Sequence, residues 1–136
     1  MWKKLWKIVQ VFVFLYGSYV IVADAILNQG FSIGEVSGES MEPTFHDMDK
    51  VLIRKYPLLY RTPRKGEVVV VYDLHDKDYI IKRIGAIPGE VVILNGKTVN
   101  LNKNQYVVIG DNSELSYDSR YYGPVHLKQI IGIVDE

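Results

Sequence analysis

The chain has no cysteine among its 136 residues, so it can form no disulfide, no cysteine-containing zinc site and no thiol nucleophile. An excess of either charge is also absent, because 16 Lys and Arg balance 16 Asp and Glu. Overall neutrality argues against a broad nucleic-acid-binding surface. The length suits one ordinary globular domain and excludes two large ones.

The local excess of positive charge stands before a long apolar run. Three lysines come first: Lys3, Lys4 and Lys7. Residues 8–23 then read IVQVFVFLYGSYVIVA, without a charge. We expect a transmembrane helix over 5–27, with Lys7 and Asp24 near the two membrane interfaces. The lysines predict a cytoplasmic N-terminus, a single pass through the cell membrane and an extracytoplasmic remainder, so the lipid bilayer is an expected partner.

Two other interpretations of this segment compete with a membrane helix: a signal peptide and a buried core helix. Ala23-Asp24-Ala25 has the A-x-A form of a signal-peptide cleavage site, which would make the segment a removable signal peptide or a site of self-cleavage. However, the apolar run exceeds the usual core of about 7 to 15 residues. A buried core helix explains poorly a segment that is apolar on all sides with a clustered basic flank. A membrane helix is therefore the preferred interpretation.

The remainder of the chain consists of short β-branched runs separated by turn residues, and it has no long helical pattern. The expected strands lie at 50–55, 67–72, 79–87, 91–94, 97–101, 105–109 and 129–134. Asn95-Gly96 predicts a two-residue hairpin turn. We expect a mainly β fold, an antiparallel β barrel or sandwich at 31–136, after a basic tip and membrane helix at 1–30. Residues 28–35 are expected to serve as a spacer between the two.

One loop, Tyr56-Pro57-Leu58-Leu59-Tyr60, is conspicuously apolar. It is expected either to fold back over the barrel core or to contact lipid.

The sequence around the three histidines argues against a catalytic or zinc-binding role for them. Each of the three histidines, His46, His75 and His126, stands in a polar or turn context and is expected at the surface. No HExxH motif is present, which disfavours a zincin. The segment Gly38-Glu39-Ser40-Met41-Glu42 lacks the last glycine of a G-x-S-x-G elbow, which disfavours an α/β-hydrolase.

Two positions nevertheless carry possible chemistry. Ser40 lies in a small-residue turn that interrupts the strand pattern, although a turn or cap serine would look the same. Lys82 lies in an apolar strand, where alternation places Ile80, Lys82 and Ile84 on one face and Ile81 and Arg83 on the other. Burial would lower the pKa of Lys82 and allow a neutral amine to act as general base to a serine, unless the side chain extends to solvent.

Four segments, taken in order, resemble the conserved boxes of type I signal peptidases. They are SGESMEPT at 37–44, KGEVVV at 65–70, IKRIGAIPGE at 81–90, and GDN at 110–112 followed by SYDSRYYGPV at 116–125. The resemblance covers most of the chain between residues 36 and 125 and follows a membrane segment in the family's position.

The resemblance implies a Ser-Lys endopeptidase that removes signal peptides from exported preproteins at the outer face of a membrane. Ser40 matches the nucleophile and Lys82 the general base, with the Ser40 backbone N–H as an oxyanion donor. Ser116 matches the serine that orients the lysine, and Asp118 and Arg120 match a supporting ion pair. Gly38 stands where some members have a hydroxyl donor, so the second oxyanion donor is unassigned.

The family cleaves after small residues, typically Ala-x-Ala, and binds the substrate as an added strand. By position, the two shallow substrate pockets are expected to involve Val36, Met41, Phe45, Ile80 and Ile81. We expect the enzyme to use no metal or cofactor and to bind no nucleic acid. We also expect it to be a monomer. The short stretch between Lys82 and Gly110 is typical of a compact bacterial member of Gram-positive type.

Three related interpretations stay open. LexA-like self-cleaving repressors share the chemistry but need a DNA-binding domain, for which this chain has neither room nor charge. A mitochondrial inner-membrane protease subunit would fit the boxes, but the N-terminus has no Arg-rich transit segment. A non-catalytic peptide-binding or assembly-chaperone member should lack Ser40 or Lys82, and both are present.

Overall fold

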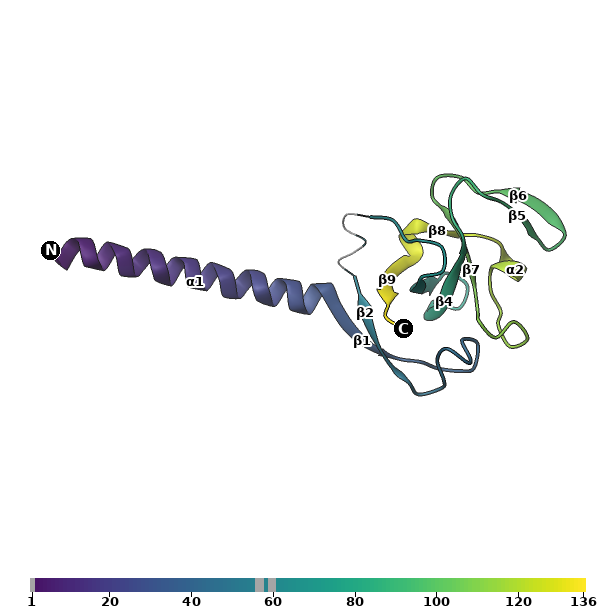
Figure 1. Ribbon diagram of the computed structural model, residues 1–136, viewed down its shortest axis with the longest axis horizontal. Coiled ribbons are helices and arrows are strands. Elements are labelled where there is room, and N and C mark those ends of the chain that lie inside the picture. The colour runs from purple at the N-terminus through teal and green to yellow at the C-terminus, as the bar shows by residue number, and fades with distance from the viewer. Residues whose placement is uncertain (1, 56–57, 59–60) are drawn as a thin grey trace.

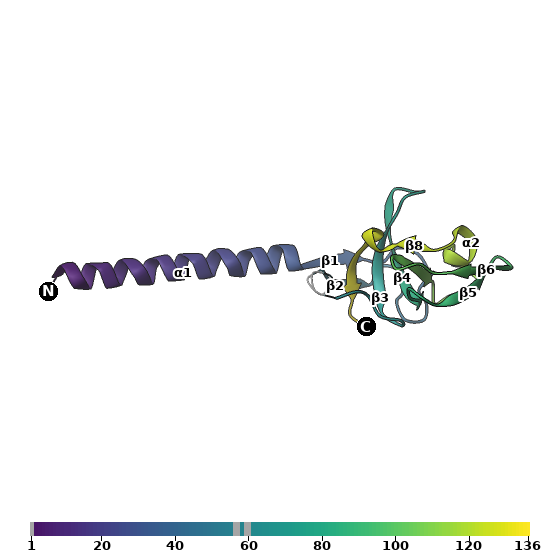
Figure 2. The ribbon, with the colours of Figure 1, turned by 90° about the horizontal axis from the view of Figure 1, so that it is seen from above.

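The computed structural model describes residues 2–55, 58 and 61–136, with the backbone alone at 25–29. A long N-terminal helix, α1 (Trp2–Gly30), extends away from a β-rich domain (Figures 1 and 2). The helix is longer at both ends than the expected span of 5–27, because no proline precedes Pro43 to stop it. Its segment Trp2–Asp24 is long and apolar enough to cross a membrane, and none of that segment is buried against the domain.

The domain is mainly antiparallel β, as the sequence predicts. The strands are β1 (Phe31–Glu35), β2 (Lys50–Arg54), β3 (Val68–Asp73), β4 (Asp78–Ala86), β5 (Val91–Leu94), β6 (Lys97–Asn100), β7 (Gln105–Ile109), β8 (Val125–His126) and β9 (Ile130–Val134). The larger sheet has the order β1-β2-β9-β3-β4-β7-β8, and β5 pairs with β6 in a separate hairpin.

The expectation of a spacer at 28–35 was wrong. Residues 31–35 form β1, which pairs with β2 in the register Phe31↔Arg54 to Glu35↔Lys50. FSIGE has too few β-branched residues to stand out as a strand, and the partner strand supplies the backbone hydrogen bonds that stabilise it. The chain therefore passes directly from α1 into the sheet.

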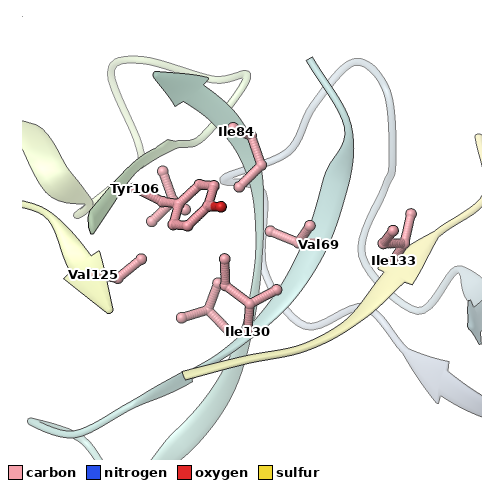
Figure 3. Packing of buried hydrophobic residues seen from close by; sticks show 8 residues of the cluster. Val69, Ile84, Tyr106, Val125, Ile130 and Ile133 are labelled. Atoms are coloured by element: carbon pink, nitrogen blue, oxygen red, sulfur yellow. The ribbon is translucent and has the colours of Figure 1, made fainter. Parts of the chain in front are cut away.

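Strand β3 is the centre of the domain, because its four valines are all buried. Val69 and Val71 pack into one cluster with Ile84, Tyr106 and Ile133, whose side chains Figure 3 shows. Val68 and Val70 face the opposite side and pack into a second cluster. The second cluster also contains Val36, Met41, Phe45, Val51 and Val134. A continuous valine run is what a strand buried on both faces requires.

The predicted hairpin between β5 and β6 is confirmed. Asn95 and Gly96 have φ angles of 53° and 73°, the left-handed pair that a type I′ turn requires. Leu94 at the end of β5 packs with Ala86, Leu101 and Val107 in a third cluster, which attaches the hairpin to the barrel.

The sequence does not predict two short helices after β7, because each is less than two turns long and too short to show a helical periodicity. They are α2 (Ser119–Tyr122) and the 3-10 turn η2 (Leu127–Gln129). Asp118 caps α2 by accepting the Arg120 backbone N–H. Of the apolar loop at 56–60 only Leu58 lies among the described residues, and it packs against the first cluster. His46, His75 and His126 are exposed, as expected.

Candidate functional site

Ser40 and Lys82, 42 residues apart in the chain, meet in a direct hydrogen bond. The Lys82 Nζ atom lies 2.8 Å from the Ser40 Oγ and 3.0 Å from the Ile81 carbonyl oxygen. Lys82 stands on β4 and shares a face with Ile80 and Ile84, as strand alternation predicts. The fold thus brings together the two residues that carry possible chemistry.

The Lys82 side chain does not extend to solvent, since only 4% of it is exposed. Burial lowers the pKa of Lys82; the negative charge of Asp118 opposes this shift, and the positive charge of Arg120 adds to it. A neutral amine at this distance can accept the Ser40 hydroxyl proton. The pair is therefore able to generate an alkoxide nucleophile without a metal.

The turn that presents Ser40 is held at several points. The Ser40 carbonyl accepts the Asn112 N–H at 3.1 Å, and the Phe45 N–H donates to the Met41 carbonyl at 3.0 Å. Met41 itself is 1% exposed and packs in the second cluster. Within the described part of the chain, no acceptor takes the Ser40 N–H. The backbone donor beside the nucleophile candidate is thus available to an incoming oxyanion.

Gly38, two residues before Ser40, has a φ of +85° and lies beside open space. Its N–H donates to the Asp47 Oδ1 at 2.8 Å. This donor is therefore already engaged, and the structure assigns no second oxyanion donor at Gly38.

Asp118 is completely buried, and its carboxylate accepts hydrogen bonds from three residues. Its carboxylate accepts the Ser116 hydroxyl at 2.6 Å, the Gly110 N–H at 2.8 Å, and the Arg120 Nε at 2.8 Å. Burial alone would raise the pKa of Asp118, but the hydrogen bonds from Arg120, Ser116 and Gly110 outweigh it and hold the pKa at about 2. The carboxylate is therefore ionised at any physiological pH.

The position of the Ser116 side chain is fixed by its hydrogen bond to the Asp118 carboxylate. Its hydroxyl donates to Asp118, whereas the hydrogen bonds of the Lys82 Nζ go to Ser40 and Ile81. Among the described residues, no hydrogen bond joins Ser116 directly to Lys82. Ser116, Asp118 and Arg120 thus form one connected group, and the charges of Asp118 and Arg120 act on Lys82 in opposite directions.

Sequence reasoning missed a second ion pair beside the dyad. Arg83, the residue after Lys82, donates from Nε to the Asp111 Oδ1 at 2.8 Å and from a terminal nitrogen to Oδ2 at 2.7 Å. The Thr44 hydroxyl donates to the same carboxylate at 2.5 Å. The hydrogen bond from Arg83 lowers the pKa of Asp111 more than any other contact. This network joins the Ser40 turn to β4, and a second basic residue directly after Lys82 in an otherwise apolar strand was the available signal.

Four of the five expected pocket residues gather in one place. Val36, Met41 and Phe45 belong to the second cluster, and Ile81 packs against it. Ile80 lies on the other face of β4 and packs against the first cluster. The alternation of the strand separates the two isoleucines.

One edge of β4 is open over half its length. Ile84 exchanges backbone hydrogen bonds with Gly66 and Glu67 on the β3 side. Alternate residues of an antiparallel strand bond to the same neighbour, so Tyr79 and Ile81 direct their backbone groups away from β3. Strand β7 pairs with β4 only from Arg83 onward. Among the described residues, no strand pairs with the Tyr79–Ile81 edge; its Tyr79 N–H donates to the Asp78 Oδ1 at 2.7 Å and its Ile81 carbonyl accepts the Lys82 Nζ at 3.0 Å. An added strand could pair there once the Tyr79 N–H exchanges its side-chain acceptor for a backbone one.

The described residues contain no group of three or more His, Cys, Asp or Glu side chains that could hold a metal ion.

Comparisons with known proteins point to one family. A model of the family "Signal peptidase, peptidase S26" matches residues 5–106 and 97–136. Signal peptidase I V of Bacillus subtilis (strain 168) is 28% identical over 86% of this chain and 91% of its own length. Signal peptidase I of Bacillus amyloliquefaciens is 30% identical over 83% of this chain and 78% of its own length.

A solved signal peptidase I from Enterococcus faecalis V583 aligns with 55% of this chain and 98% of its own length, at 19% identity and a TM-score of 0.48. The family match covers nearly all of the chain. The protein belongs to the signal peptidase family, peptidase S26, and is a serine endopeptidase.

Proposed function

We propose that this protein is a membrane-bound endopeptidase that removes signal peptides from exported preproteins after small residues, with Ser40 as nucleophile and Lys82 as general base. The hydrogen bond of 2.8 Å between the Lys82 Nζ and the Ser40 Oγ carries the proposal. The burial of that amine supports the role of Lys82, because burial favours the neutral, basic form.

The reaction begins when neutral Lys82 takes the Ser40 hydroxyl proton as the Oγ attacks the scissile carbonyl. The Ser40 N–H donates to the oxygen that becomes negative, a contact that typically contributes ~3 to 4 kcal/mol. The Lys82 ammonium then gives its proton to the leaving amine as the C–N bond breaks, which leaves the signal peptide esterified to Ser40. Lys82 next takes a proton from water, the water oxygen attacks the ester, and the proton returns to the Ser40 Oγ.

Asp118, Ser116 and Arg120 support this chemistry without taking part in it. Asp118 is buried and ionised, so its charge stabilises the ammonium form that Lys82 passes through. Arg120 binds the same carboxylate through its Nε and a terminal nitrogen and prevents Asp118 from being an unpaired buried charge.

The substrate would bind as an extended strand on the Tyr79–Ile81 edge of β4, with which β7 does not pair. Beside this edge, Met41 and Val36 are 1% and 4% exposed, so little space is left for a side chain. A tightly packed apolar surface of this kind would accept alanine more readily than a larger side chain, which agrees with an Ala-x-Ala site.

The exposed apolar helix α1 would anchor the enzyme in the membrane. The three lysines at its start favour a cytoplasmic N-terminus, and the catalytic domain then lies outside the cell membrane. All of the proposed catalytic groups come from one chain, so a monomer suffices for activity.

The deciding experiment is cleavage of a model preprotein with an Ala-x-Ala site by the detergent-solubilised full-length protein. Wild type should cut after the second alanine, and Ser40→Ala and Lys82→Ala should each lower the rate by at least roughly a thousandfold. Ser113→Ala and Lys103→Ala, which alter an exposed serine and an exposed lysine, serve as matched controls.

Circular dichroism should show that all four variants are folded. A wild-type protein that does not cut, or a Ser40→Ala variant that cuts normally, would reject the proposal and favour a non-catalytic peptide-binding member of the family.

A further inference from the structure

A cavity of about 170 Å³ lies on the Lys82 face of the sheet, and Ile80, two residues before Lys82, contributes to its lining. Val71 and Ile80, which are partners in the β3–β4 register, both line it. Ile80 shares its face of β4 with Lys82, whereas Ile81 turns to the opposite face. The cavity is therefore separate from the Met41 and Phe45 cluster, yet it borders the same stretch of unpaired edge.

The cavity carries negative charge that is not neutralised. Asp73 lines it, accepts the His75 N–H at 2.8 Å through Oδ1, and forms no ion pair with any described residue. Asp78 is the direct partner of Asp73 across the hairpin. Two like charges opposite each other in an antiparallel pair are unfavourable, and a cation beside them would relieve the repulsion.

Tyr122 gives the same cavity an aromatic wall. Burial raises the pKa of Tyr122, and the charges of Asp73 and Asp118 raise it further, so the phenol stays protonated. An intact phenol ring next to a carboxylate is a favourable surrounding for an ammonium or guanidinium group. The charge of Asp73 also reaches the dyad, since it opposes the lowering of the Lys82 pKa.

An extended peptide on the unpaired edge of β4 points alternate side chains to opposite faces of the sheet. If the two alanines of Ala-x-Ala face the cluster of Val36, Met41 and Phe45, the middle residue faces the Ile80 side and the cavity. We propose that the cavity is a subsite for this middle residue and that Asp73 makes it prefer a lysine or arginine side chain. This inference rests on the proposed function.

The test compares three preproteins that differ only in the middle residue, Ala-Lys-Ala, Ala-Gln-Ala and Ala-Glu-Ala. For wild type, kcat/KM should be about three- to five-fold higher with lysine than with glutamine, the range of a partly exposed charge pair, and glutamate should be cut more slowly than glutamine. In Asp73→Asn the lysine-to-glutamine ratio should fall to about one, and in Asp73→Lys it should invert.

Ratios between substrates are used because Asp73 also affects the pKa of Lys82, and that effect acts on all three substrates alike. Asp76→Asn, which removes an exposed charge from the same turn without touching the cavity, should keep the wild-type ratio.

The outcomes separate the two proposals. Cleavage of all three substrates with a wild-type ratio near one, or a lysine preference that survives in Asp73→Asn, would overturn the subsite and leave the peptidase function intact. Failure to cut any of the three would overturn both.

Discussion

Gly110 lies against Ser116 so closely that a β-carbon on Gly110 would stand 2.2 Å from the Ser116 Oγ and 2.5 Å from the Ser40 carbonyl oxygen. The contact joins the turn that presents the nucleophile to the residue that bonds Asp118. A side chain at this position would push apart two segments that must stay together for the dyad to form.

Gly110→Ala should therefore lower both stability and activity. We expect the free energy of unfolding to fall by about 1 to 3 kcal/mol, as for an overpacked core, and the cleavage rate to fall at least roughly tenfold. Urea unfolding and initial rates on the Ala-x-Ala preprotein would measure the two effects. Gly85→Ala is the control, because its β-carbon would meet the flexible Ile109 side chain at 3.3 Å and should cost much less. If Gly110→Ala cleaved the preprotein at the wild-type rate, the prediction would be wrong, and the backbone around residue 110 would be able to shift enough to accommodate the added β-carbon.

The pH dependence of kcat/KM should report the ionisation of Lys82. Burial lowers its pKa below the usual value of ~10.4, and only the neutral amine can accept the serine proton. The rate should therefore fall on the acid side as Lys82 becomes protonated. The negative charge of Asp73 favours the ammonium form, so Asp73→Asn should move the acid limb to lower pH, whereas Asp76→Asn should not. A flat profile well below neutrality would contradict the neutral-lysine mechanism.

Asp118 should make stability depend on acid pH. Its pKa is about 2 in the fold against 3.8 in the unfolded chain, so the unfolded state binds more protons between these values. The contribution of about 2 kcal/mol is complete above the unfolded pKa and is lost as the pH falls through 2. Urea unfolding at pH 5 and near pH 2 should show this loss in wild type. Asp118→Asn should be less stable at pH 5, and the gap between the proteins should narrow toward pH 2; a gap that is constant with pH would be inconsistent with an ionised carboxylate.

The absence of cysteine makes the membrane orientation directly measurable. Single-cysteine variants Trp2→Cys and Lys103→Cys place a thiol at the start of α1 and on an exposed turn of the domain. In intact spheroplasts, a membrane-impermeant maleimide should label Lys103→Cys at once and label Trp2→Cys only after the membrane is opened. The reverse labelling pattern would place the domain in the cytoplasm, and equal labelling of both would indicate that α1 does not span.

Much of the fold follows from local pattern. The apolar run of α1 has no charge to interrupt it, and the Asn95-Gly96 turn needs only its own two residues to adopt positive φ. Alternation along β4 correctly placed Lys82 with Ile80 and Ile84. In contrast, β1 depends on pairing with β2, and α2 depends on its cap Asp118, whose buried carboxylate also bonds Gly110 and Ser116; neither element has a strong signal of its own.

The candidate site, like the fold, has features that the sequence predicts and features that depend on the packed structure. Residue type and spacing are enough to predict the apolar N-terminal helix, the mainly β class and, through four ordered boxes, which serine and which lysine to examine. The packing of distant strands is needed to show that the Lys82 amine is buried and 2.8 Å from Ser40, that Ser116 bonds Asp118 rather than Lys82, and that Arg83 joins Asp111 to the Ser40 turn. Desolvation and hydrogen-bond geometry arise where strands distant in the sequence pack together, and no local pattern contains them.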